Sequence, residues 1–297
     1  MKRVTFIPSG DIENAGARFR AYWPAQFMPN ATVATWPDIR AGKLPDADAY
    51  VFQKLVDIAL MKELRERGAL VFWDVCDPAW WFNPADAREA VKVSSGMVAS
   101  SDALAADLTE WGGRRAHVIA DRVWLGHYTR QCRHEDRSPV RFIWYGSAQN
   151  RIALYGAAAN MARLRGDGHD VALTVFDNAP ESPIPGLDAD FPVYYTRWTL
   201  ARESETLAAH DIALLPPYPG PWGVVKSNNR TVSAWATGLP VTSGMDYRTM
   251  VKLVTDVELR RTSMAAGLDA VRRGWNIERS ASEWTALIEE HNNDGTD

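Results

Sequence analysis

The sequence predicts an α/β protein made of two successive doubly wound halves. Three observations lead to that fold class. Short apolar runs alternate with segments of helical periodicity, which is the pattern of parallel βαβ units. A polar loop containing glycine follows the first apolar run of each half, at residues 9–16 and 146–151, and such loops lie at the carboxyl ends of strands, where doubly wound folds bind ligands. The pattern also occurs twice, in halves of similar size.

The first half opens with an apolar strand at residues 4–8 and a helix at residues 17–27. The fingerprint G-x-G-x-x-G is absent between them, so a nicotinamide cofactor is not expected. Asp11, Arg18 and Arg20 are candidate ligand contacts, although each alone also fits a solvated surface charge. Further strands are expected at residues 50–53, 70–74, 97–100 and 117–120, and helices at residues 57–67 and 102–111.

The loop at residues 74–84, with the sequence DVCDPAWWFNP, carries the most chemistry of this half. A carboxylate in an aromatic pocket has a raised pKa and can serve as a general base. Asp77, beside Trp80 and Trp81, is therefore a candidate base, and the aromatic faces could hold a sugar or a nucleobase. The alternative is that Asp77 and Pro78 start a turn with the aromatic side chains packed beneath it. For Asp74 a structural role is the better interpretation.

A polar, poorly periodic segment at residues 121–138 is interpreted as the linker between two domains, placed at 1–130 and 131–297. The final helix is expected to pack back on the first domain. In the second half, strands are expected at residues 140–145, 171–176, 193–195, 212–215 and 239–242, and helices at 152–165, 199–208, 256–273 and 280–292.

The stretch at residues 216–242 is the most informative part of the second half. A helix is predicted to begin near Ser227 and to end before Gly238, with Lys226 and Arg230 at its start. The helix dipole disfavours cations at that end. No Asp or Glu lies between Asp211 and Asp246. A bound anion, best a phosphate held by free backbone N–H groups, would supply the missing charge; the alternative is a poorly capped helix.

Charge and composition limit the functions that can be expected of this chain. The net charge of the 297 residues is −4, so the chain lacks a general basic footprint for nucleic acid. Two cysteines without motif spacing fit a reduced, cytoplasmic protein, and no apolar run is long enough to span a membrane. His127 and His134 have no partners at metal-ligand spacing, so no metal site is expected. The Asp-x-Asp triplets at residues 46–48 and 188–190 are interpreted as surface turns.

The segment KSNNRTVSAWATGLPV, residues 226–241, resembles the donor-site segment of GT-B glycosyltransferases, in particular the large family-4-like group that uses nucleotide sugars. Weaker similarity extends to SSDALAADL at residues 100–108 and WYGSAQNR at residues 144–151. The resemblance implies two Rossmann-like domains facing a cleft, with the nucleotide sugar mainly on the second. It implies donor and phosphate contacts from Gly146, Ser147, Arg151, Lys226, Ser227, Asn228, Asn229, Arg230 and Ser233.

The expected activity is metal-independent transfer of a hexose from a UDP- or GDP-sugar to a hydroxyl, without a cofactor. The acceptor is a saccharide, a small metabolite or a hydroxymethylated pyrimidine in phage-type DNA, with Arg18, Arg20, Trp80 and Trp81 as acceptor contacts. Asp77 is the first candidate for the base of an inverting enzyme and Asp11 the second. The family's usual acid pair is replaced by Val225 and Ser233. Two alternatives therefore stay open: a sugar-nucleotide 2-epimerase on the same fold, and a non-catalytic relative that binds nucleotide sugars.

Overall fold

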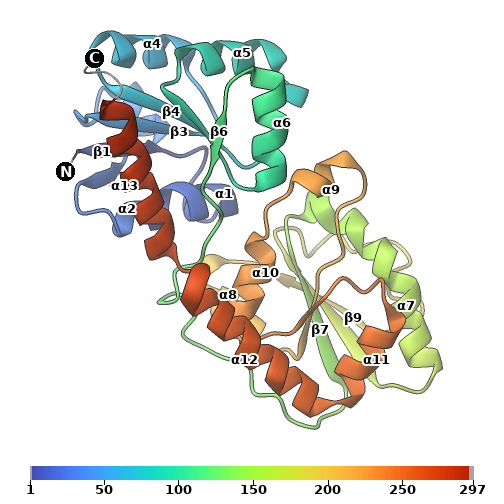
Figure 1. The fold of residues 1–297 in the computed structure, drawn as a ribbon. Helices are drawn as coiled ribbons and strands as arrows, with labels where there is room; N and C mark the ends of the chain where they lie inside the picture. Colours follow the sequence, from blue (N-terminus) through green and yellow to red (C-terminus); the bar gives the residue numbers. More distant parts are fainter. Residues whose placement is uncertain (1, 294–297) are drawn as a thin grey trace. The chain divides into compact units, whose positions relative to one another are not determined.

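The computed structural model describes residues 2–293 and divides into two compact units (Figure 1). The first unit takes the described residues of Met1–Val123, Val224–Asn228 and Asn276–Asp297, and the second takes Trp124–Gly223 and Asn229–Trp275. The first break lies inside the predicted linker. The division differs from the predicted ranges 1–130 and 131–297, because two later segments belong with the first unit.

The described part of the first unit holds a parallel sheet in the order β2-β1-β3-β4-β5-β6. Its strands are β1 (Val4–Ile7), β2 (Ala31–Val33), β3 (Ala49–Gln53), β4 (Leu70–Val75), β5 (Gly96–Ala99) and β6 (Ala116–Val118). Its helices are α1 (Ala15–Ala17), η1 (Arg18–Tyr22, a π-helical turn), α2 (Trp23–Gln26), α3 (Trp36–Arg40), α4 (Ile58–Glu66), η2 (Ala79–Trp81), α5 (Pro84–Val93), α6 (Asp102–Gly112) and α13 (Ile277–Asn293).

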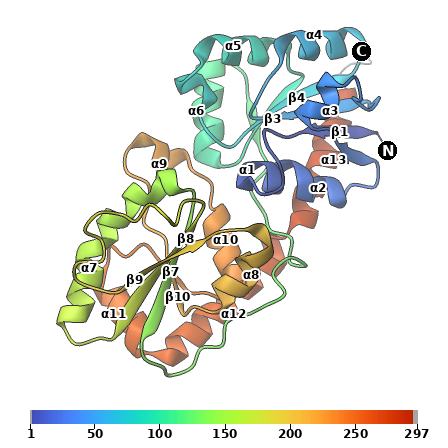
Figure 2. The ribbon, with the colours of Figure 1, turned by 180° about the vertical axis from the view of Figure 1, so that it is seen from behind.

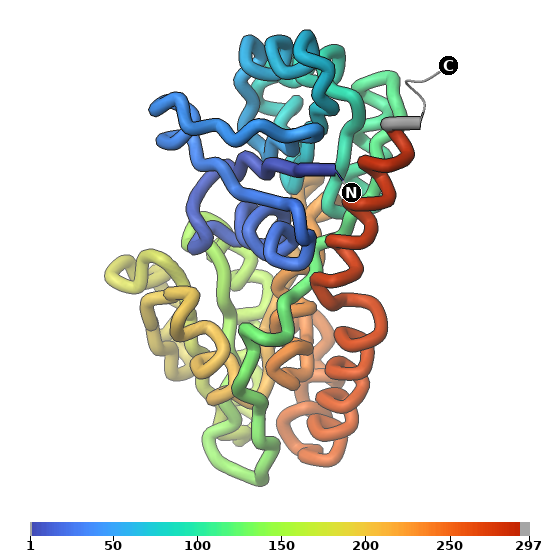
Figure 3. Tube along the Cα trace, turned by 90° about the vertical axis from the view of Figure 1, so that its left-hand side faces the viewer, coloured from blue at the N-terminus to red at the C-terminus, as the bar shows by residue number. Residues whose placement is uncertain are grey.

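Helices cover both faces of this sheet. Helices α4, α5 and α6 lie on one face, and α2 and α13 lie on the other (Figures 1 and 2). Trp284 of α13 packs edge-on against Phe6 and Phe72, with ring centroids 5.7 and 6.0 Å apart. Because its buried side chains belong to the same cluster as those of β1, β3, β4 and α2, α13 completes the core of the first unit. The predicted return of the last helix to the first domain is thus confirmed, and Figure 3 shows α13 running beside the N-terminal strand.

The second unit holds a parallel sheet in the order β11-β10-β7-β8-β9 within the described residues. Its strands are β7 (Val140–Gly146), β8 (Val171–Asp177), β9 (Val193–Arg197), β10 (Ile212–Leu214) and β11 (Val241–Thr242). Its helices are η3 (Ala148–Leu154), α7 (Tyr155–Gly166), α8 (Leu200–Ala208), α10 (Asn229–Ala236), α11 (Tyr247–Thr255) and α12 (Val257–Gly274), and α9 (Pro221–Val225) runs across one of the breaks between the units.

The core of the second unit lies between its sheet and the helices α7 and α11. Helices α8, α10 and α12 lie on the opposite face (Figure 2). Every predicted strand is present, with small shifts of its ends. The structure adds β2, α3, α5, α9 and α11, which the sequence pattern did not predict. Among the described helices, none is both long and apolar enough to cross a membrane.

Candidate functional site

Three residues meet at the carboxyl end of β7, in the second unit. The guanidinium carbon of Arg230, at the start of α10, lies 5.9 Å from the centre of the Trp144 ring. A β-carbon added to Gly146 would stand 3.7 Å both from Cδ of Arg230 and from the Trp144 ring, so the backbone there is covered by these two side chains. Gly146 has φ +154°, which favours glycine. The hydroxyl of Tyr145 donates to the carbonyl oxygen of Arg230 and fixes the helix start.

Arg230 is half-buried, and no carboxylate of residues 2–293 forms an ion pair with it. Its Nη1 and the indole Nε1 of Trp144 are both buried donors that find no acceptor among the described residues. Burial lowers the pKa of the Arg230 guanidinium. A buried donor without a partner costs about 1–3 kcal/mol, and more when it is charged, so this corner of the sheet is suited to an anion.

Two other predicted donor contacts, Ser147 and Arg151, differ from Arg230 in their hydrogen-bond partners. Arg151 is buried and paired through Nε and Nη2 with the carboxylate of Asp177. It also donates to the carbonyl oxygens of Ala179 and Ser182. Its donors thereby hold the loop after β8 in the ligand-free protein, and the expected contact of Arg151 with the diphosphate stays a prediction. Ser147 directly precedes η3, and its neighbour Ala148 donates its backbone N–H to Asn178 Oδ1 at 2.8 Å.

Ser233 is buried on α10 and is joined to a polar chain. Its Oγ lies 2.8 Å from the hydroxyl of Tyr128. That hydroxyl lies 3.3 Å from Oε2 of Glu203, which is also 3.2 Å from Nε2 of His127. The serine at the family's usual acid position is therefore linked to a buried carboxylate on α8. Sequence reasoning did not identify Glu203.

Lys226 and Asp77 form an ion pair inside the first unit. Nζ of Lys226 lies 2.7 Å from Oδ1 of Asp77, and Nζ of Lys54 lies 2.8 Å from Oδ2. Burial acts to raise the pKa of Asp77, but the charges and hydrogen bonds of Lys226 and Lys54 outweigh it and lower the pKa. The expected raised pKa is therefore wrong for the ligand-free protein: lysines, not aromatic rings, set the charge of Asp77.

The residues around Lys226 are anchored on both sides. Ser101 donates to the carbonyl oxygen of Val225 at 3.0 Å, and Ser227 donates to Asp121 Oδ2 at 2.6 Å. Ser227 thus has a partner within the protein. The half-buried side chains of Asn228 and Asn229 make no hydrogen bond within residues 2–293, so they are available to a ligand.

Both arginines predicted to contact an acceptor are buried and bonded within the first unit. Arg20 donates to Asp74 through Nε at 2.7 Å and to Asp121 through Nη1 at 2.8 Å. Arg18 donates to the carbonyl oxygens of Ile12 and Glu13. Since each is only 2% exposed, both arginines hold elements of the first unit together in the ligand-free protein, and their contact with an acceptor stays a prediction.

Of the two tryptophans after β4 that were predicted to contact an acceptor, one is buried and one is exposed. Trp80 is buried, stacks on Trp111 at 5.9 Å and donates its Nε1 to Asp107 at 3.0 Å. Trp81 donates to the same carboxylate at 3.1 Å but stays 41% exposed. Trp80 is therefore packed beneath the loop, which is the alternative that the sequence left open. The Trp81 ring, in contrast, is accessible.

A pocket of about 680 Å³ opens at the strand ends of the first unit, and we call it the strand-end pocket. It lies where β1 is flanked by β2 on one side and β3 on the other, which is the topological switch point of the sheet. Segments that follow each of the three strands line it, and its lining includes Asp11, Tyr22 of η1, Trp36 and Arg40 of α3, Leu55 and Asp57. Of the two candidate bases, Asp11 thus lines a pocket of substrate size.

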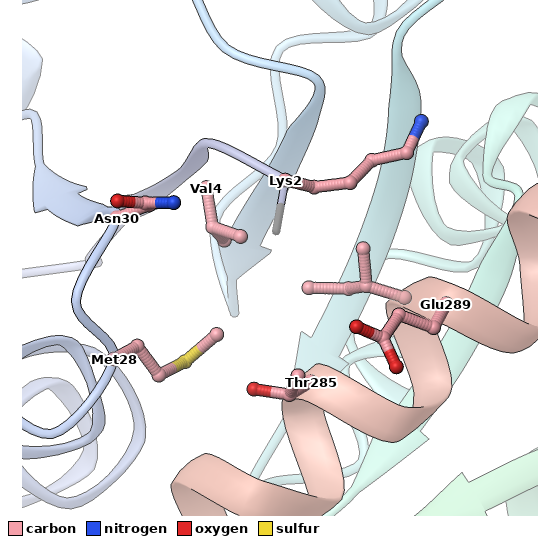
Figure 4. Close-up of a pocket in the computed structure, with 7 residues that line it drawn as sticks. Lys2, Val4, Met28, Asn30, Thr285 and Glu289 are labelled. Atoms are coloured by element: carbon pink, nitrogen blue, oxygen red, sulfur yellow. The ribbon is translucent and has the colours of Figure 1, made fainter.

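A second hollow, between the start of β1 and α13, is far smaller. Figure 4 shows Lys2 and Glu289 at its rim with Val4 and Met28 beside it. Its volume is about 20 Å³, which suffices for one water. It is a packing defect rather than a substrate site. Among the described residues, no group of three or more His, Cys, Asp or Glu side chains is placed to hold a metal.

The two parallel sheets, each with helices on both faces and polar loops at the strand ends, define the GT-B class of fold, as the sequence predicted. No protein-family model matches the sequence, and no curated protein matches it. Solved structures do match the fold, and those reported below share 10% of residues or fewer with this chain.

An α-glucosyltransferase in complex with UDP and a 13-mer DNA containing an HMU base matches with a TM-score of 0.69 at 10% identity, over 97% of this chain and 99% of that one. A glycosyltransferase from Rickettsia africae gives 0.63 at 10% identity over 98% of both chains. TarM gives 0.60 at 10% identity over 81% of this chain and 54% of its own, so the chain spans about half the length of TarM.

The sequence interpretation missed Lys54, Trp144 and Trp36. Lys54 directly follows β3 and Trp144 lies within β7, so their positions at strand ends were the available signal. Trp36 follows β2, which is short and only partly buried and was not predicted.

Proposed function

We propose that the chain is a glycosyltransferase that moves a hexose from a nucleoside-diphosphate sugar to a hydroxyl acceptor without a metal. The observation that carries the proposal is the half-buried Arg230 guanidinium, placed over Trp144 and beside Gly146 with an unpaired N–H. A diphosphate oxygen would satisfy this donor and the charge together, since charge-assisted bonds from arginine to phosphate are among the strongest.

The proposed mechanism follows from the leaving group, which is the nucleoside diphosphate. As the anomeric carbon–oxygen bond breaks, negative charge grows on the diphosphate, and fixed cations stabilise it without a metal. Arg230 and Lys226 stand four residues apart in the segment that resembles a donor site, with Asn228 and Asn229 between them. UDP is the first choice of nucleotide, because two of the matching structures contain it.

The strand-end pocket is the proposed acceptor site, and its chemistry favours a neutral, hydroxyl-rich ligand. Its charged lining side chains are Asp11, Asp57 and Arg40, so carboxylates outnumber cations. The buried Nε1 of Trp36 has no acceptor within residues 2–293 and is a donor for a ligand oxygen. DNA binding relies on many contacts from Lys and Arg to phosphates. A saccharide acceptor therefore fits this pocket better than the DNA of the matching α-glucosyltransferase.

A donor screen tests the proposal. The protein is incubated with UDP- and GDP-hexoses, with and without EDTA, in the presence of methyl glycosides or of an oligonucleotide containing 5-hydroxymethyl pyrimidine. Release of nucleoside diphosphate that requires a methyl glycoside and survives EDTA is expected. Release only with the oligonucleotide would keep the transferase and refute the saccharide acceptor. A changed sugar without release would mean an epimerase, and donor binding without either would mean a non-catalytic relative.

Arg230→Ala tests the donor site directly. Loss of one charge-assisted contact is expected to cost about 1.5–3 kcal/mol, or roughly 10- to 100-fold in affinity for UDP, with uridine almost unaffected. Arg163→Ala is the matched control, because Arg163 also lies over an aromatic ring, that of Tyr247 at 4.0 Å, but away from β7 on α7. Calorimetric titration provides the affinities. Equal UDP binding by wild type and Arg230→Ala would remove Arg230 from the site.

A further inference from the structure

Another pocket of ligand size lies in the second unit, at the edge of its sheet, and we call it the edge pocket. Its volume is about 510 Å³, which is within the range of small-molecule sites. Strand β11 is the outermost strand there, and Val241 of β11 lines the pocket. The other walls come from Pro240 and from α10, α11 and α12, so every lining residue belongs to the second unit.

The edge pocket is separate from the carboxyl end of β7, where Arg230 lies. Through β10, Val241 is level with Ile143 of β7. Gly146 lies three residues further along β7, which is about 10 Å, and two strand spacings, about another 10 Å, separate β7 from β11. A ligand in the edge pocket therefore occupies a different place from the diphosphate proposed beside Gly146 and Arg230.

Apolar groups form most of the lining of the edge pocket. A β-carbon added to Gly267 of α12 would stand 2.9 Å from Cδ1 of Trp235, so the indole ring lies against the α12 backbone. Ala266 and Ala270 are one turn apart on the same face of α12, and their side chains are small. Leu253 of α11 adds an aliphatic wall. The pocket is therefore suited to an apolar ring or chain.

One cation stands in this apolar lining. Lys252, in the last turn of α11, is the only charged residue among the described residues that line the pocket. It is exposed and forms no ion pair within residues 2–293. Ser263 also lines the pocket, and its hydroxyl makes no hydrogen bond to another described residue. A ligand with one negative charge would match this pair of groups.

The edge strand supplies a backbone donor as well. The carbonyl oxygens of Pro240 and Thr242 accept hydrogen bonds from Ala213 and Leu215 on the β10 side. Because alternate residues of a parallel strand bond to the same neighbour, Val241 directs its N–H away from β10, toward the open edge of the sheet. Strand β11 is only two residues long, which is too short an edge for a peptide to add as a strand. The occupant that fits is therefore a small molecule.

We propose that the edge pocket binds a small monocarboxylate with an apolar body. The apolar body lies against Trp235 and the small residues of α12, and the carboxylate pairs with Lys252 and accepts from Ser263. One lysine matches the single charge of a carboxylate, whereas a phosphate monoester carries about −1.5 to −2 at neutral pH. The site does not depend on glycosyl transfer, because none of its lining residues is among the predicted donor or acceptor contacts.

Displacement of the fluorescent dye 8-anilinonaphthalene-1-sulfonate tests the site, because the dye combines an apolar body with a single anionic group. Octanoate is expected to displace the dye from the folded protein, whereas octylammonium, with the same chain length and the opposite charge, is not. Saturating UDP should leave dye binding unchanged. Equal displacement by both octyl compounds, displacement by UDP, or a wild type that binds neither dye nor octanoate would overturn the proposal.

Two pairs of variants locate the binding. Ala266→Leu fills the pocket and should weaken octanoate binding at least about tenfold, since a clash built into a site acts against its ligand. Its control is Ala265→Leu, at an exposed position of α12 outside the pocket. Lys252→Met should weaken octanoate binding up to about fivefold, the range of an exposed ion pair, and Arg248→Met, exposed on the same helix outside the pocket, is its control.

Circular dichroism checks that each variant folds, and leucine is a good helix former, so α12 should be retained. Equal octanoate binding by wild type and a folded Ala266→Leu would overturn the proposal. Calorimetric titration of the same variants with UDP reports the proposed donor site separately. Failure of octanoate to bind, with UDP binding intact, would therefore remove the edge pocket as a site and leave the transferase proposal standing.

Discussion

Arg20→Met is expected to destabilise the first unit strongly. The Arg20 side chain is 1% exposed. The side chains of its two partners are equally buried, with Asp74 0% and Asp121 1% exposed. It donates to both carboxylates and, through Nη1, to the carbonyl oxygen of Ile119 at 2.8 Å. Methionine fills similar space but leaves two carboxylates buried without their shared cation.

The expected loss of unfolding free energy follows from leaving these two carboxylates unpaired. Removing one partner of a buried ion pair costs about 3–5 kcal/mol, because the remaining charge stays buried. For a unit of this size about 3 kcal/mol corresponds to a fall of roughly 10 °C in Tm. The pair itself contributes less than this, since replacement of all its members by apolar groups can be nearly neutral.

Hydrogen exchange read by mass spectrometry is the suitable assay, because it reports β4 and η1 separately from the second unit. Protection in β4 should fall by the factor that corresponds to the lost free energy, while β7 keeps its protection. Arg40→Met is the control, since Arg40 is exposed on α3 and should change stability by less than about 0.5 kcal/mol. A loss below about 1 kcal/mol for Arg20→Met would refute the structural assignment and reopen a ligand role.

Three further changes have defined outcomes. Trp284→Ala should cost about 3–5 kcal/mol in denaturant unfolding, because the ring fills the space against β1 and β4; a loss under about 1 kcal/mol would mean that α13 is not part of the core. Gly146→Ala should weaken UDP in calorimetry while circular dichroism stays unchanged, since φ +154° strains alanine; normal UDP affinity would place the phosphate elsewhere. Asp77 has a lowered pKa, so its contribution to stability is present above the unfolded carboxyl pKa and is lost as pH falls through the lower folded value. Asp77→Asn should therefore flatten the acid side of the stability curve, and an unchanged curve below the unfolded carboxyl pKa would contradict the lysine pairing.

The fold was predictable because its signals are local. Parallel strands buried on both faces appear as apolar runs, and the helices between them show their period. Segments without such a signal were missed. Strand β2 is three residues long and partly exposed, and α5 begins with Asn83 and Pro84, which indicate a turn as well as a helix start.

The site was predictable only where the charge pattern was itself local. Arg230 was identified because the sequence around it contains no acid, and the structure places none in ion-pair distance within the described residues. The buried ion pairs of Arg20 were not predicted, because its partners lie 54 and 101 residues away, beyond any periodic pattern. Asp77 was likewise judged by its aromatic neighbours in sequence, whereas its pKa depends on Lys226, 149 residues later.

The position of α13 affects how the chain folds during synthesis. The strands of the first unit are complete once residue 118 has been made, but the helix that covers Phe6 and Phe72 begins at Ile277. At translation rates of roughly 5–20 residues per second, the ribosome needs on the order of 10–30 s to add the intervening residues. For that time the apolar side chains that α13 covers are exposed on the nascent chain, and the second unit is itself completed only at Trp275, just before α13 is made. Ribosome-associated chaperones that bind apolar segments should therefore stay on the first unit until late in synthesis. They should leave only when α13 emerges.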